Sequence, residues 1–71
     1  MKFKKGDIVW CRWPNVYCIT NYHVMCQVTD AYKEDWGEQI TVEVLEGKHA
    51  GCDYRVDAKD FELAHQKAVI V

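Results

Sequence analysis

The sequence predicts an all-β fold of five short strands, and three features of the chain indicate it. The pair Gly6-Asp7 is a turn signal placed directly before a run of strand-forming residues. Across residues 22–46, apolar and polar side chains alternate with a period of two, as in strands that bury one face. Residues 54–63 then indicate a short strand, a single helical turn and another short strand. A chain of 71 residues is long enough for one domain.

The first strand is expected to begin after this turn and to end at Pro14. A proline nitrogen carries no N–H, so it cannot donate to the hydrogen-bond ladder of a sheet. We expect Val9 and Cys11 to point into the core. Because side chains alternate along a strand, this places Trp10 on the outer face.

Two long strands are expected in the centre of the chain, over residues 22–32 and 39–46. The segment between them, residues 33–38, is polar and contains Gly37, which predicts a hairpin turn. The side chains expected to point inward from these strands are Val24, Cys26, Val28, Ile40, Val42 and Val44.

The last part of the chain completes the predicted fold. After a loop with two glycines, residues 53–56 form a fourth strand, residues 58–61 a single 3-10 turn, and residues 62–64 a fifth strand beside the first. This order predicts a small five-stranded SH3-like barrel over residues 1–64, with one 3-10 turn before the last strand. Residues 65–71 are an apolar tail that could add an edge strand or pair with another chain, so monomer and homodimer both stay open.

Composition narrows the function classes. The hydrophobic fraction of 49% is ample for a globular core, and the net charge of −2 is no general signal for nucleic acid. The charge is uneven, because residues 1–29 carry four basic and one acidic side chain, whereas residues 30–71 carry five basic and ten acidic ones. No apolar run reaches the ~20 residues of a membrane span, and no signal peptide is apparent. We therefore expect a cytoplasmic protein whose four cysteines are free thiols.

Aromatic side chains are the first candidates for a binding site. The chain holds seven tryptophan and tyrosine rings, more than a domain this small can bury, and exposed rings of this kind anchor protein interfaces. The loop over residues 14–21 is unusually apolar, and the hairpin over residues 33–38 is acidic. The residues predicted to bind a partner are Trp10, Trp13, Tyr17, Tyr22, Trp36, Glu34 and Asp35.

Metal binding and catalysis find little support in the residue pattern. Cys18, His49 and Cys52 could ligate zinc, but the chain has no Cys-x-x-Cys pair. Several cysteine–histidine pairs could be assigned as a nucleophile and its base, but no oxyanion site or third orienting group is apparent in the sequence. The sequence therefore predicts no metal, no cofactor and no enzymatic activity.

The pattern of core and turn residues resembles small SH3-like proteins encoded by bacteriophages and prophages. This resemblance implies a phage or bacterial origin and brings no assigned biochemistry with it. Locally, residues 6–12 are similar to the first strand of PWWP and Tudor domains, although the Pro-Trp-Trp-Pro segment and the C-terminal helices of those domains are absent. The positions that carry the phage-type resemblance are Phe3, Gly6-Asp7, Val9, Tyr17, Ile19-Thr20-Asn21, Ile40, Val42, Val44-Leu45, Gly51, Tyr54, Val56 and Phe61-Glu62-Leu63.

Two functions follow as expectations. The first is a non-enzymatic protein-binding module, a phage-encoded protein that binds and modulates a host protein by covering its surface. The alternative is a nucleic-acid-binding accessory protein that uses its basic, aromatic first strand to contact a phosphate backbone and stack on bases. The residues that would do so are Lys2, Lys4, Lys5 and Arg12 with Phe3, Trp10 and Trp13.

Overall fold

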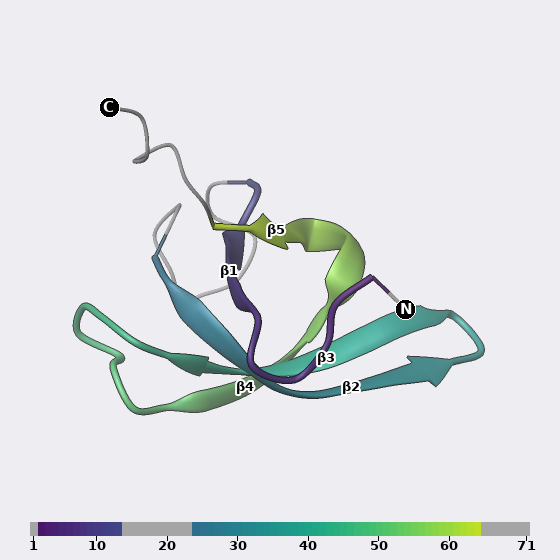
Figure 1. Ribbon diagram of the computed structural model, residues 1–71, viewed down its shortest axis with the longest axis horizontal. Coiled ribbons are helices and arrows are strands. Elements are labelled where there is room, and N and C mark those ends of the chain that lie inside the picture. The colour runs from purple at the N-terminus through teal and green to yellow at the C-terminus, as the bar shows by residue number, and fades with distance from the viewer. Residues whose placement is uncertain (1, 14–23, 65–71) are drawn as a thin grey trace.

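The computed structural model describes residues 2–13 and 24–64 of the chain (Figure 1). The predicted all-β class is confirmed: the described residues form five strands and one 3-10 turn, and they contain no α-helix. None of their helical structure has the length and apolarity needed to cross a membrane. The elements are β1 (Ile8–Cys11), β2 (Cys26–Glu34), β3 (Gly37–Val44), β4 (Asp53–Asp57), the 3-10 turn η1 (Ala58–Asp60) and β5 (Phe61–Leu63).

All five strands belong to one antiparallel sheet with the order β4-β3-β2-β1-β5. The predicted pairing of the last strand with the first is confirmed, because Val9 lies opposite Leu63 and Cys11 opposite Phe61. The sheet is open among the described strands, with β4 and β5 as its two edges. These two edge strands follow each other in the chain and are joined only by η1.

Every strand contributes to a single core. Val9 and Cys11 are fully buried on β1, while Trp10 between them is half-buried, as the alternation predicted. The largest fully buried side chain is Phe61, at the start of β5. Among residues 2–13 and 24–64, the buried apolar residues are Phe3, Val9, Cys11, Cys26, Val28, Ile40, Val42, Val44, Val56, Ala58 and Phe61.

The turn before β1 is built as the sequence indicates. The backbone N–H of Lys4 donates to the Asp7 side chain at 3.0 Å, and the Asp7 N–H donates back to the Lys4 carbonyl at 3.1 Å. Gly6 adopts a φ of 96°, which an L side chain rarely takes. Its N–H donates to the Val28 carbonyl at 2.7 Å, so this turn attaches the N-terminal segment to β2.

The central hairpin differs from the prediction at its bounds. The strand expected over residues 22–32 begins later, at Cys26, and continues to Glu34, and its partner begins at Gly37 instead of residue 39. The turn predicted over residues 33–38 is therefore only the two residues Asp35 and Trp36, closed by the pair Glu34–Gly37. Within this polar segment, residues 33–34 and 37–38 pair with one another in the sheet and so belong to the strands. Polarity alone therefore predicted a turn that was too long.

A β-bulge interrupts β2 between Val28 and Asp30, where Thr29 has no Cα partner on β3. The Thr29 hydroxyl donates to the Thr41 carbonyl at 3.3 Å across the pair. A bulge adds one residue to one strand and increases the local twist. Beyond it, β2 and β3 run on to the turn, which lies at one extremity of the long axis of the molecule in Figure 1, opposite the loop between β3 and β4.

Candidate functional site

The end of the β2–β3 hairpin brings three of the predicted binding residues together. Trp36 stands in the turn and is 73% exposed, the most exposed large apolar side chain among the described residues. Asp35 precedes it and is exposed, and Glu34 closes β2 just before the turn. An exposed indole directly after two acidic residues gives this surface a mixed apolar and acidic character.

Contacts from β4 support this hairpin. Arg55 Nη2 lies 3.4 Å from Glu34 Oε2, and the Arg55 guanidinium also lies over the Tyr32 ring, 4.8 Å from its centroid. One arginine thus joins β4 to two positions of β2. These contacts connect the hairpin near its turn to β4, although each exposed ion pair by itself contributes little to stability.

A small hollow of about 90 Å³ lies beside Trp36. Its lining combines the hairpin end with β4 and η1, so residues far apart in sequence share it. The lining residues are Trp36, Gly37, Glu38, Gln39, Asp57 and Lys59. Cavities that hold small-molecule ligands usually measure ~300–1,000 Å³, so this hollow has room for the end of one side chain.

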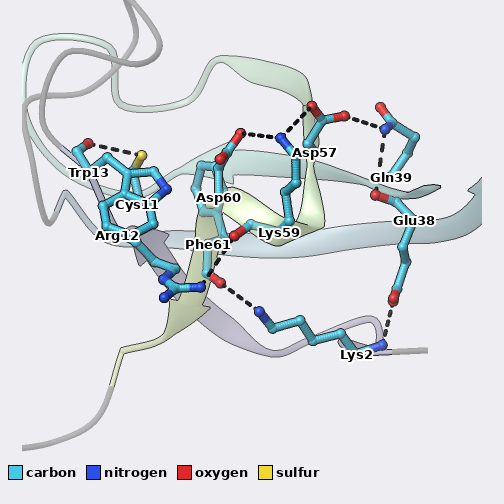
Figure 2. A network of polar contacts seen from close by, with 10 residues as sticks. All are labelled: Lys2, Cys11, Arg12, Trp13, Glu38, Gln39, Asp57, Lys59, Asp60 and Phe61. Carbon is cyan, nitrogen blue, oxygen red and sulfur yellow. Dashed lines mark hydrogen bonds and ion pairs between the residues drawn. The ribbon is translucent and has the colours of Figure 1, made fainter. Parts of the chain in front are cut away.

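Gln39 is the buried polar residue of this site, with only 7% of its surface exposed. It lies opposite Asp57 in the β3–β4 ladder. Its side-chain Nε2 donates to Asp57 Oδ1 and to the Glu38 carbonyl oxygen, the latter at 3.5 Å. Figure 2 shows this amide between the Glu38 backbone and the Asp57 carboxylate.

Polar contacts connect the hollow with the N-terminal segment and η1 (Figure 2). The backbone N–H of Lys2 donates to Glu38 Oε2, and Lys2 Nζ donates to the Phe61 carbonyl at 3.2 Å. Lys59 Nζ lies 3.7 Å from Asp57 Oδ2 and 3.8 Å from Asp60 Oδ2, so two carboxylates share its charge. Five segments of the chain therefore hold the walls of the hollow in place.

The two predicted tryptophans of the first strand belong to other contacts. Trp10 Nε1 donates to Glu62 Oε2 on β5 at 2.9 Å, and the ring is half-buried. Trp13 is 45% exposed, and the Arg12 guanidinium covers its ring at 4.7 Å from the centroid. Both rings already take part in intramolecular contacts. The predicted residues Tyr17 and Tyr22 lie outside the described residues.

The basic residues near β1 are partly neutralised within the protein. Lys4 Nζ lies 3.6 Å from Asp7 Oδ1, and Arg12 Nη1 donates to the Lys59 carbonyl at 3.4 Å. Glu62 stands opposite Trp10 in the β1–β5 ladder, so a carboxylate occupies the same surface. This face offers a nucleic acid backbone a mixed rather than a uniformly positive potential.

Two of the three cysteines in the described part of the chain are buried. Cys11 and Cys26 are free and fully buried, and burial raises the pKa of both thiols, that of Cys26 to about 11. Both are therefore protonated near neutral pH, and a protonated thiol is a poor nucleophile. Cys52 is exposed and free. Residues 2–13 and 24–64 contain no group of three histidine, cysteine or acidic side chains placed to hold a metal ion, and Cys18 lies outside these ranges.

Sequence reasoning identified Trp36 and its acidic neighbours but missed Gln39, Asp57 and Lys59. A polar residue inside an alternating strand is expected to face solvent, and only the pairing of β3 with β4 places Gln39 against Asp57. Comparison of the chain with protein-family models, with curated proteins and with solved structures finds no match.

Proposed function

We propose that this chain is a non-enzymatic protein-binding module whose contact surface is the end of the β2–β3 hairpin. The observation that carries the proposal is Trp36, which is 73% exposed in a two-residue turn beside a small hollow. Leaving an indole in water loses the free energy that its burial would contribute, and tryptophan is among the residues most enriched at the energetic centres of interfaces.

The local structure favours binding with little reorganisation. The turn has only two residues, the Glu34–Gly37 pair closes it, and Arg55 links it to β4. A surface that is already ordered loses less conformational entropy when a partner binds. The hairpin end is therefore a suitable anchor point.

The charge around Trp36 indicates the kind of partner. Asp35 is exposed next to it, and Glu34 and Glu38 flank the turn. Complementary potentials accelerate association and select partners, so the expected partner surface is basic around an apolar recess. Binding would then cover part of the partner and block access to it.

The same proposal includes a complete SH3-like barrel and a phage or prophage origin. The strand order and the direct connection of both sheet edges through η1 support the barrel. The origin rests on the sequence resemblance alone. On this proposal the protein acts in the cytoplasm of a bacterial host cell, on a host protein.

A capture experiment tests the proposal. Immobilised wild-type protein is incubated with a bacterial lysate, and bound proteins are compared with those held by Trp36→Ala and by Leu63→Ala, which removes a side chain that is 50% exposed on β5. We expect a specific partner to be lost with Trp36→Ala and kept with Leu63→Ala, while circular dichroism shows both variants folded. Equal capture by all three proteins would refute the assigned surface.

A further inference from the structure

We propose that the hollow beside Trp36 receives the guanidinium group of an arginine side chain, an inference that rests on the proposed protein-binding function. The residues that line it include an exposed tryptophan, the acidic residues Glu38 and Asp57, and Gln39, whose side-chain amide is buried. Each of these three features complements a different property of a guanidinium: its flat face, its charge and its hydrogen-bond donors.

The buried amide supplies the first argument. Gln39 Nε2 faces the Glu38 carbonyl and the Asp57 carboxylate, and both of these groups accept hydrogen bonds, which fixes the orientation of the amide. Gln39 Oε1 therefore lies on the other side, as Figure 2 shows. Within the part of the chain that the structure describes, no hydrogen bond to this oxygen is formed. A carbonyl oxygen at a residue that is 7% exposed calls for a donor, and a ligand N–H can supply it.

The local charge supplies the second argument. Among the residues that line the hollow, Glu38 and Asp57 are acidic and Lys59 is basic. Lys59 is already shared between two carboxylates, so the site favours a cationic guest over an anionic one.

The aromatic rings supply the third argument. In the described part of the chain, a guanidinium lies over a ring at two places, Arg12 over Trp13 at 4.7 Å and Arg55 over Tyr32 at 4.8 Å. Among the described residues, no cation or second ring stacks on Trp36. An arginine from a partner would complete this third pairing, and its N–H groups would donate to Gln39 Oε1. The hollow of about 90 Å³ suits such a small, flat group.

The test uses N-acetyl-arginine amide as the probe and N-acetyl-citrulline amide as its neutral control. Both are titrated into the ¹⁵N-labelled full-length protein, and the signals of the Trp36 indole N–H and the Gln39 side-chain amide are followed. We expect saturable shifts of both signals with the arginine compound and binding at least about fivefold weaker with the citrulline compound, since hydrogen bonds to charged groups are the stronger ones.

Three variants test whether the arginine compound binds at the hollow beside Trp36. Gln39→Met removes the acceptor at similar volume, and Trp36→Ala removes the stacking face, for which we expect about two- to fivefold weaker binding. Trp13→Ala changes a ring already covered by Arg12 and is expected to leave binding unchanged. Equal binding of the two compounds, or unchanged binding in both Gln39→Met and Trp36→Ala, would overturn the proposal.

The outcome is separable from that of the capture experiment. If Trp36→Ala abolishes partner capture but the arginine compound does not bind, the protein-binding function stands and the arginine site is refuted. If the arginine compound binds at this hollow and no partner depends on Trp36, the arginine site stands and the proposed function is refuted.

Discussion

Stability should fall at alkaline pH because of one buried thiol, Cys26. This side chain has no exposed surface, and burial first, then the nearby charges of Cys11 and Glu46, raises its pKa from 9.0 to about 11. The unfolded chain deprotonates near pH 9, whereas the folded chain holds its proton until about pH 11. The contribution is therefore fully present below pH 9 and is lost as the pH rises through the folded pKa.

The size of this effect follows from the shift. A shift of one pKa unit corresponds to about 1.4 kcal/mol, so two units correspond to ~2–3 kcal/mol between pH 9 and 11. A domain of this length has a total unfolding free energy on the order of 4–10 kcal/mol. The loss would therefore remove a large part of the stability and would be visible in a simple unfolding experiment.

The assay is urea unfolding at several pH values from 8 to 11 in the presence of a reducing agent. Wild type is compared with Cys26→Ala, which lacks the thiol, and with Cys52→Ala, which removes an exposed one. Between pH 8 and 11, we expect the unfolding free energy of wild type and of Cys52→Ala to fall by ~2–3 kcal/mol more than that of Cys26→Ala. Cys11, whose pKa burial also raises, is present in all three proteins, so the difference between the curves reports on Cys26. A Cys26→Ala curve parallel to the wild-type curve would show that this thiol does not carry the pH dependence.

Three further predictions concern the core, the hairpin turn and the alternative function. Phe61→Ala empties the largest fully buried site and should lower the unfolding free energy by about 3–5 kcal/mol, measured by urea unfolding, with Leu63→Ala as the exposed control. Gly37→Ala should cost at least about 1 kcal/mol by the same measurement, because Gly37 has a φ of 139° although a Cβ would meet no atom within 4 Å. Mixed-sequence DNA or RNA should not bind even at ~50 mM salt, measured by fluorescence anisotropy, and salt-sensitive binding lost in Arg12→Ala would instead favour the nucleic-acid function.

Much of the fold was predictable because buried and exposed side chains alternate along its strands, and this alternation is visible in the local sequence. Ile40, Val42 and Val44 alternate with polar residues in sequence, and all three are buried. The pairing of β5 with β1 was likewise predictable from the order of elements. The Thr29 bulge was not, because it depends on how β2 meets β3 and leaves no mark in the alternation of a single strand.

The candidate site was predictable only in part, for a related reason. Trp36 could be identified because an indole in a polar turn has little chance of burial. Gln39 could not, because its burial depends on the register that sets it opposite Asp57 on β4. Polar networks between strands distant in sequence depend on tertiary structure, whereas exposed turn residues depend mainly on local sequence.

The structure also separates the aromatic side chains by the contacts they already make. Trp10 donates to Glu62 and thereby joins β1 to β5, and Trp13 lies beneath Arg12. A partner that used either ring would have to compete with a contact inside the protein. Trp36 has no such competing contact among the described residues, and Gln39, which lines the hollow beside it, has a side-chain oxygen that accepts no hydrogen bond from them. The hairpin end is therefore the part of the described surface where a partner can form new contacts while displacing the fewest contacts within the protein.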